Sequence, residues 1–315
     1  MNPKTKLNDD EIRRICHRHG IKYKSHERIT TGFSHEVHRL NDDLVIKLFN
    51  KVTKKNYFVE KSILFGNFPA IKKPQFVAGY DRLDSFDSER AYIIMSYLDG
   101  VSLGKVWHKV SDGNREKLIE EISSTLKAFQ AIPAESLAID SHDNWVEYLW
   151  NKVNKLIYRL KQKDIISAGR ETDVISAFQK AIRYFAEDEP LQTIYWDIHF
   201  DNFIVDKDYN LLGIIDLENV RRLPIDYPLF VIRRQMKEPH KYLAEEDEKY
   251  AKKEDYQNLW GWYQRYYPEM FTPKNLEERI LTYQLLDELH LMIDWSHDAE
   301  LRESFEDKIE KFHNL

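Results

Sequence analysis

The stretch Tyr195-Trp-Asp-Ile-His-Phe-Asp-Asn202 decides the fold of this chain, together with Ile214-Ile-Asp-Leu-Glu218. Apolar runs typical of short strands lie at 202–205 and 211–215, so they follow the first stretch directly. The polar residues of the first stretch therefore form a loop that leads into a predicted hairpin. Such a hairpin would bring Asn202, at its start, close to the second stretch, at its end.

The residue types in this hairpin match the chemical needs of phosphoryl transfer. One carboxylate must position an acceptor hydroxyl and receive its proton, and an amide and a second carboxylate must hold Mg²⁺ on the phosphates. Asp197, Asn202 and Asp216 are the candidates for these three tasks. The alternative interpretation is a plain hairpin whose polar ends are turn residues.

The chain before this hairpin is predicted to be rich in strands, after a first helix that Asn8 can cap. After a hinge near 96–100 the apolar spacing becomes helical. The predicted elements before the hinge are a helix at 8–20, three antiparallel strands within 26–50, a helix around 58–65, and strands at 76–80 and 91–95. The predicted helices after the hinge are 113–131, 143–163, 171–187, 247–267, 275–296 and 298–313.

This order of elements predicts an α+β protein built from two lobes. Residues 1–98 would form a small, antiparallel, β-rich lobe that binds a nucleotide. Residues 99–315 would form a larger, mainly helical lobe that carries the hairpin and the acceptor site. A length of 315 residues is sufficient for both lobes to have substantial cores.

Composition excludes several other classes of protein. Apolar residues make up 42% of the chain and charged residues 32%, as in globular proteins. The formal net charge of −6 lacks the basic character of nucleic-acid-binding proteins. No apolar run approaches the roughly 18 residues of a membrane span. The single cysteine, Cys16, excludes an intramolecular disulfide. We expect a cytoplasmic monomer or homodimer without nucleic-acid or membrane partners.

The two stretches resemble the motifs of the aminoglycoside phosphotransferase and choline kinase family, whose loop commonly reads H-G-D-x-H-x-x-N and whose metal site reads I-D-[FW]-[ED]. The resemblance implies a protein-kinase-like two-lobe fold, with ATP and Mg²⁺ as cofactors. It also implies that Asp197 is the catalytic base, that Asn202 and Asp216 bind Mg²⁺, and that His199 shapes the loop. Tyr195-Trp196 replaces the usual His-Gly.

The same resemblance assigns phosphate-binding residues to the first lobe. Lys47, in the third predicted strand, would contact the phosphates, because a cation there neutralises their charge. Glu60 in the next helix would orient this lysine. The loop before the second strand carries a single glycine, and Ser34 is its candidate phosphate contact.

The hinge would hold the adenine base through the backbone of Ser96 and Leu98. Val45 would cover the base from above, and Ile204 and Ile215 from below. Each of these three apolar residues would also be a core residue in a protein without a nucleotide site.

The acceptor site would lie on the C-terminal helices in this family. Tyr283, Asp287, His290 and Asp294 fall on one face of the helix at 275–296, where carboxylates would suit an amino sugar or another cation. The alternative is an ordinary solvated helix face. Asp226 is expected to anchor the catalytic loop.

The expected activity is therefore transfer of a phosphate from ATP to a hydroxyl of a small molecule, with an aminoglycoside-like or other antibiotic favoured as the acceptor. Choline, ethanolamine or a sugar is the alternative acceptor. A pseudokinase that binds nucleotide in a regulatory role is a further alternative. A protein kinase is disfavoured, because G-x-G-x-x-G, H-R-D, D-F-G and A-P-E are absent from the sequence.

Overall fold

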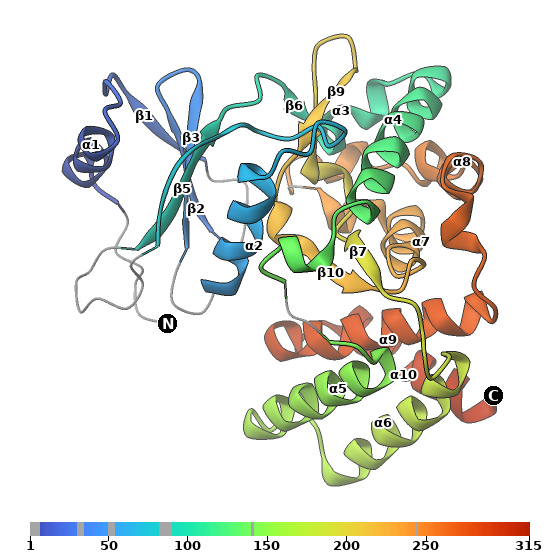
Figure 1. Ribbon diagram of the computed structural model, residues 1–315. Coiled ribbons are helices and arrows are strands. Elements are labelled where there is room, and N and C mark those ends of the chain that lie inside the picture. The colour runs from blue at the N-terminus through green and yellow to red at the C-terminus, as the bar shows by residue number, and fades with distance from the viewer. Residues whose placement is uncertain (1–6, 30–34, 50–53, 82–89, 140–141, 244) are drawn as a thin grey trace.

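The computed structural model describes residues 7–29, 35–49, 54–81, 90–139, 142–243 and 245–315. An antiparallel sheet occupies one end of the molecule, and helices make up most of the remainder (Figure 1). Within the described segments, no helix combines the length and the apolar character that a bilayer crossing requires.

The first part of the chain forms a five-stranded sheet with the strand order β1-β2-β3-β5-β4. The predicted cap is present, because the Asn8 side chain accepts a hydrogen bond from the Glu11 amide while the Glu11 carboxylate accepts one from the Asn8 amide. The elements are α1 (Asp9–Arg18), β1 (His26–Ile29), β2 (Glu36–Leu40), β3 (Leu44–Phe49), α2 (Lys54–Phe65), β4 (Phe76–Tyr80) and β5 (Ala91–Ser96).

Alternation along β3 gives the sheet two different faces. Ile46 and Leu48 pack into a small core with residues of α1. Val45 and Phe49 point the other way, into the main core that includes α2. Lys47 shares this second face, because side chains alternate along a strand. The strand pattern thus directs the lysine towards α2 and the helical part of the molecule.

The second part of the chain is mainly helical and contains two small sheets. One has the strand order β6-β8-β9, and the other pairs β7 with β10. The strands are β6 (Val101–Ser102), β7 (Gln192–Tyr195), β8 (Phe203–Val205), β9 (Leu211–Ile214) and β10 (Val220–Leu223). The α-helices are α3 (Leu103–Val106), α4 (Asp112–Gln130), α5 (Trp145–Gln162), α6 (Ala168–Ala181), α7 (Leu229–Lys237), α8 (Leu259–Tyr266), α9 (Leu276–Trp295) and α10 (Ala299–Asn314).

The helix predicted at 247–267 is wrong over its first half, since only Leu259–Tyr266 is α-helical there. Two long-range contacts hold the preceding chain in short turns. Trp107 Nε1 donates to the Asp255 carbonyl oxygen at 2.8 Å, and Arg115 Nη2 donates to the Asp255 carboxylate at 2.7 Å. These partners come from distant parts of the sequence, so local apolar spacing could not reveal them.

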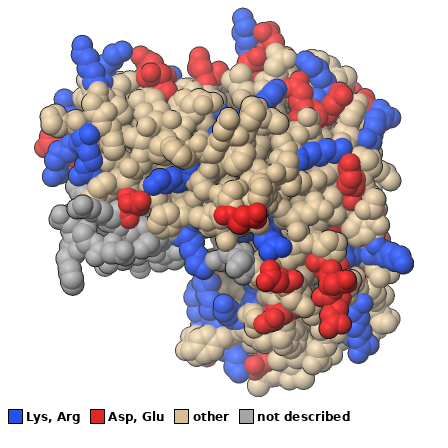
Figure 2. Space-filling view, in the orientation of Figure 1, with Lys and Arg blue, Asp and Glu red and all other residues tan. Residues whose placement is uncertain are grey.

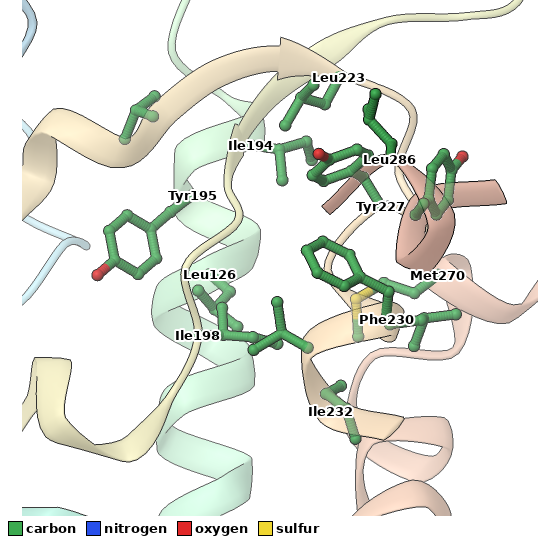
Figure 3. Close-up of a cluster of buried hydrophobic side chains, with 14 of the residues drawn as sticks. Leu126, Ile194, Tyr195, Ile198, Leu223, Tyr227, Phe230, Ile232, Met270 and Leu286 are labelled. Atoms are coloured by element: carbon green, nitrogen blue, oxygen red, sulfur yellow. The ribbon is translucent and has the colours of Figure 1, made fainter. Parts of the chain in front are cut away.

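A buried apolar cluster supports the predicted loop from below. Ile194 of β7 and Ile198 of the loop lie near Tyr227 and Phe230, whereas Tyr195 points to the other side of the strand (Figure 3). Along the loop, Ile198 and Phe200 are each 1% exposed, whereas the alternate residues Asp197 and His199 are only partly buried. Burial of alternate loop residues fixes the direction in which the polar ones point.

Arg279 on α9 forms a buried ionic cluster that ties three segments together. Its guanidinium donates to both carboxylate oxygens of Asp226, at 2.7 and 2.6 Å, and to both of Glu189, at 2.9 and 2.7 Å. Tyr283 donates to the same Asp226 carboxylate at 3.1 Å. Asp226 therefore anchors α9 and, through Arg279, the segment just before β7, which leads into the loop.

Arg279→Met is expected to destabilise the fold by about 3–5 kcal/mol, because it leaves Asp226 and Glu189 buried and unpaired. The free energy of unfolding in urea measures this change. Lys161→Met, which removes an exposed pair with Glu171, is the matched control and should cost at most about 1 kcal/mol. Equal losses in the two variants would contradict the proposed role of the cluster.

Glu36 on β2 gives the stability a defined dependence on pH. Burial alone would raise the pKa of its carboxyl, but hydrogen bonds from His38, Arg90 and the Leu7 amide outweigh that effect and lower the pKa from 4.5 to about 2. A pKa that is lower in the folded state adds stability above pH 4.5, and this stability is lost as the pH falls towards 2.

Glu36→Gln is therefore expected to remove up to about 3 kcal/mol of the difference between the unfolding free energies at pH 6 and pH 2. Urea denaturation across this range would test it, with the exposed Glu27→Gln of β1 as control. A variant whose pH profile matches that of the wild type would contradict the assignment.

Candidate active site

Asp197 lies at the end of β7 and is held by two asparagine side chains. Asn202 Nδ2 donates to the Asp197 carboxylate at 3.2 Å and to its carbonyl oxygen at 2.9 Å. Asn219 Nδ2 donates to the same carboxylate oxygen at 2.9 Å. The Asp197 side chain remains 21% exposed, so it is fixed in direction and still accessible to a reactant. This combination suits a base that must meet one particular proton.

The hairpin brings Asn202 and Asp216 together as the sequence predicts. The Ile215 amide donates to the Asn202 carbonyl oxygen at 2.9 Å, so Asn202, just before β8, and Asp216, just after β9, flank two paired strands. Asp216 adopts the left-handed conformation, with φ 55° and ψ 46°, which turns the chain out of β9. Asp and Asn tolerate this conformation better than most residues.

The replacement of His-Gly by Tyr195-Trp196 has a structural explanation. The Tyr195 hydroxyl donates to the Ile215 carbonyl oxygen at 3.0 Å, which joins the end of β7 to the chain just after β9. The Trp196 ring stacks against Phe230 at a centroid distance of 6.1 Å. Both side chains thus connect the loop to residues that follow it in the sequence, Ile215 and Phe230.

Lys47 is the centre of a buried cluster of charges. Its Nζ lies 2.7 Å from Glu60 Oε2, 2.7 Å from Asp216 Oδ1 and 3.1 Å from Glu218 Oε2. Burial opposes its positive charge, but Asp216 and Glu60 raise the pKa of Lys47 well above its usual value. The structure therefore brings the predicted Lys47, Glu60 and Asp216 into direct contact.

Glu218 belongs to this cluster, although the sequence reasoning gave it no role. His35 Nε2 lies 2.7 Å from Glu218 Oε2, and Asn56 Nδ2 donates to Oε1 at 3.1 Å. Glu218 thereby connects the C-terminal part to α2 and to the residue just before β2. The signal was present in the sequence as an acidic residue two positions after Asp216, in the position where the family motif allows one.

The charges around Lys47 fit a divalent cation. One lysine faces three carboxylates, of Glu60, Asp216 and Glu218, so the cluster has an excess of negative charge. The described part of the chain contains no group of three His, Cys, Asp or Glu residues placed to hold a metal on their own. Mg²⁺ commonly uses one or two protein ligands and takes the others from phosphates and water. Asn202 and Asp216 are sufficient for that mode of binding.

The hinge offers a backbone donor for a nucleotide base. The Leu98 amide makes no hydrogen bond to any described residue, while the Ser96 amide is engaged by the Gln75 carbonyl oxygen at 2.9 Å. Gly100 allows β8 to approach the hinge, since a Cβ there would lie 2.3 Å from the Val205 carbonyl oxygen. The same Cβ would lie 2.9 Å from Ile204 Cγ2, which places Ile204 beside the hinge.

Two of the other predicted nucleotide contacts, Val45 and Ile215, lie within the described residues. Val45 is 8% exposed and lies on the same face of β3 as Lys47. Ile215 precedes Asp216 and is partly buried. Ser34 lies outside the described residues.

The four residues predicted for the acceptor site do not act as one surface. Tyr283 is fully buried and bonded to Asp226, so as an acceptor contact it is wrong. Asp294 is exposed and lies 3.4 Å from Lys163, and His290 is also exposed. Asp287 alone is partly buried, in an ion pair with Arg234. Helical spacing identified a common face but not which part of it is covered by neighbouring elements.

Two further polar residues shape the loop and were not predicted. Asn219 holds Asp197, as described above. Asp201 accepts a hydrogen bond from the Ser102 hydroxyl at 2.5 Å. Gly104 permits this approach, because a Cβ at that position would lie 2.4 Å from Asp201 Oδ1. These contacts join β6 and α3 to the loop across a long sequence separation.

Comparisons with known proteins agree with this geometry. The sequence profile of the phosphotransferase enzyme family matches residues 26–266. No curated protein sequence matches the chain. Among solved structures, the chain is similar to APH(2″)-IIa in a ternary complex with streptomycin and ATP, with a TM-score of 0.66 and 15% identity, over 98% of this chain and 97% of that one.

Two other solved structures extend the comparison. A GDP complex of aminoglycoside 2′-phosphotransferase-IIIa gives a TM-score of 0.64 at 15% identity, over 98% of this chain and 100% of that one. A thermostable mutant of aminoglycoside phosphotransferase APH(4)-Ia, with ADP and hygromycin B, gives 0.64 at 13% identity, over 95% of this chain and 97% of that one. The likeness confirms the expected protein-kinase-like α+β fold.

Proposed function

Since this chain belongs to the phosphotransferase enzyme family, we propose that it transfers the γ-phosphate of ATP to a hydroxyl group of a small molecule, with Mg²⁺ as cofactor. One observation carries the proposal. The Asp197 carboxylate is held by Asn202 and Asn219 at the base of the same hairpin that presents Asp216 to Lys47. A base, a metal-binding pair and a phosphate-binding cation thus converge from separate parts of the sequence.

The proposed mechanism assigns one task to each of these residues. Asp197 orients the acceptor hydroxyl and receives its proton. Lys47 contacts the phosphates, and Glu60 holds its ammonium group in place. Asn202 and Asp216 would bind Mg²⁺, which neutralises phosphate charge when it is present. Catalysis by positioning and electrostatics requires no covalent enzyme intermediate.

The nucleotide is proposed to bind with its base at the hinge. The Leu98 amide, which has no hydrogen-bond partner among the described residues, supplies a donor to the base, and Val45, Ile204 and Ile215 supply apolar surface. Adenine is proposed over guanine, because the side chain of Met95, one residue before the end of β5, would narrow the space behind the hinge. The solved neighbours include complexes with ATP, ADP and GDP, so GTP is the proper competitor to test.

The acceptor class is the least constrained part of the proposal. The aminoglycosides bound in the neighbouring structures make a hydroxylated antibiotic the first candidate, and choline, ethanolamine or a sugar the alternative. A regulatory protein that binds nucleotide without transfer is a further alternative. The single cysteine supports a cytoplasmic location for any of these.

Transfer of labelled γ-phosphate tests the proposal. The full chain would be incubated with Mg²⁺–ATP or Mg²⁺–GTP and a panel of aminoglycosides, macrolides, choline, ethanolamine and sugars. Label on one class of compound, and none with Asp197→Ala, would establish the activity and its acceptor. Tight nucleotide binding without Asp197-dependent ADP formation would instead favour the regulatory alternative.

A further inference from the structure

One short turn after β9 carries or adjoins three side chains that organise the candidate site. Asp216, the candidate metal ligand, directly precedes the turn Leu217–Asn219. Asn219 ends the turn and donates to the Asp197 carboxylate at 2.9 Å. Glu218, between them, contacts residues of the N-terminal part of the chain. The placement of this turn therefore affects the metal ligand and the base together.

Lys47 connects β3 to this turn, but its ammonium group also has a proposed task in phosphate binding. Its Nζ lies 2.7 Å from Glu60, 2.7 Å from Asp216 and 3.1 Å from Glu218. An ammonium group has three protons, so these three carboxylates can accept all of them. A phosphate oxygen that binds Lys47 would therefore replace one carboxylate, and Glu218 makes the longest of the three contacts.

His35 provides a second connection between β3 and Glu218. Its Nε2 lies 2.7 Å from Glu218 Oε2 and 3.0 Å from Oε1. Its Nδ1 lies 3.1 Å from the Leu48 carbonyl oxygen, and its ring packs against the Phe49 ring at a centroid distance of 4.7 Å. Leu48 and Phe49 directly follow Lys47 on β3. His35 therefore ties Glu218 to the same strand without using the lysine.

The surroundings of this contact make it stronger than an ion pair on the surface. Acidic and basic side chains are scattered over the face shown in Figure 2, where water weakens such pairs. The side chains of His35 and Glu218 are only 4% and 8% exposed. Asn56 of α2, which lies between the first sheet and the helical part (Figure 1), also donates to Glu218 Oε1 at 3.1 Å. We therefore expect the contact to persist when Lys47 binds a phosphate.

We propose that Glu218 is a positioning residue for phosphate transfer, and that His35 is the partner through which it acts. The pair holds the turn Leu217–Asn219 at a fixed distance from β3 while Lys47 exchanges a carboxylate for a phosphate oxygen. Neither Glu218 nor His35 contacts the reactants in this role. The inference rests on the proposed function and adds a requirement for a contact between the two parts of the chain.

Replacement of each partner tests the pair. Glu218→Gln keeps the size of the side chain and removes its charge. We expect it to lower kcat by about 10- to 100-fold, since a misplacement of about 1 Å can cost 10²-fold. His35→Ala should have a similar effect. The double variant should be no slower than the slower single variant, because residues that act through one contact are not additive. The rate measured is Asp197-dependent ADP formation from Mg²⁺–ATP, with the panel of acceptors described above.

Conservative replacements of His35 identify which ring nitrogen matters. A glutamine side chain can place its amide donor near the position of Nε2, whereas asparagine reaches only the position of Nδ1. His35→Gln should therefore recover much of the kcat that His35→Ala loses, and His35→Asn should recover little. His17→Ala and Glu27→Gln, at exposed positions of α1 and β1, are the matched controls and should behave as the wild type.

The Mg²⁺ requirement and the thermal stability distinguish positioning from two other roles of Glu218. We expect the half-saturating Mg²⁺ concentration to be unchanged in Glu218→Gln. A strong rise would identify Glu218 as a metal ligand and overturn the positioning role. A lower melting temperature with a wild-type kcat would show that the pair only stabilises the fold, which would also overturn it.

The outcomes separate this inference from the proposed function. ADP formation by the wild type that is no greater than that of Asp197→Ala, with every compound and with water alone, would refute the function and the inference with it. Asp197-dependent ADP formation that is equally fast in the wild type, Glu218→Gln and His35→Ala would overturn the pair and leave the function standing. Additive losses in the double variant would overturn His35 as the partner of Glu218.

Discussion

Asp197→Ala is expected to reduce phosphate transfer by between about 10² and 10⁴-fold, the usual contribution of a positioned general base. The variant removes the carboxylate that Asn202 and Asn219 hold, while the contacts of Lys47 with Glu60 and Asp216 stay intact. Nucleotide affinity should therefore change little. Calorimetric titration with Mg²⁺–ADP and a steady-state rate measurement would separate the two quantities.

Asp208→Ala is the matched control for this prediction. Asp208 lies on the turn between β8 and β9, and its side chain is exposed. The Asp208→Ala variant loses a carboxylate from the same hairpin without changing the candidate site. Its transfer rate should therefore equal that of the wild type. A near wild-type rate for Asp197→Ala would refute the assignment of the base, whatever the control shows.

Asp216→Asn is expected to lower the transfer rate by roughly 10³-fold at a fixed Mg²⁺ concentration, because a metal ion supplies several kcal/mol of charge stabilisation. Asparagine is the informative replacement, since it is well tolerated at the left-handed φ of 55° and keeps the size of the side chain. Alanine would add backbone strain to the loss of the carboxylate.

The dependence on Mg²⁺ distinguishes a metal ligand from a purely structural residue. We expect the half-saturating Mg²⁺ concentration to rise strongly in Asp216→Asn and to be unchanged in Asp208→Asn. Thermal unfolding of the nucleotide-free variant should remain cooperative, because Lys47 keeps Glu60 at 2.7 Å and Glu218 at 3.1 Å. An unaltered Mg²⁺ requirement would show that Asp216 does not bind the metal.

The fold was largely predictable from local patterns. Short apolar and β-branched runs bounded by turn residues identified β3 and β5, and the capping pair Asn8 and Glu11 identified the start of α1. The pattern did not reveal α7, because its apolar start, Leu229-Phe-Val-Ile232, follows Pro228 and lacks helical spacing. Tertiary packing against the core, rather than local propensity, decides that the segment is helical.

The amino-acid sequence by itself determined the hairpin and the order of the candidate site residues along it. Asp197, Asn202 and Asp216 lie within one strand–turn–strand unit, and the geometry of a hairpin leaves them little choice of position. Lys47 and Glu60 were named from the family resemblance, and the structure places their side chains 2.7 Å apart, from β3 and α2.

Only the tertiary structure decided which residues of the predicted acceptor face on α9 are buried or already paired. The helical face of Tyr283, Asp287, His290 and Asp294 was visible in the sequence, but its partners come from distant segments. Asp226 takes Tyr283 into the core, and Arg234 neutralises Asp287. The contribution of a charged side chain depends on which counter-charges fold against it, and periodicity within one helix contains no information about those neighbours.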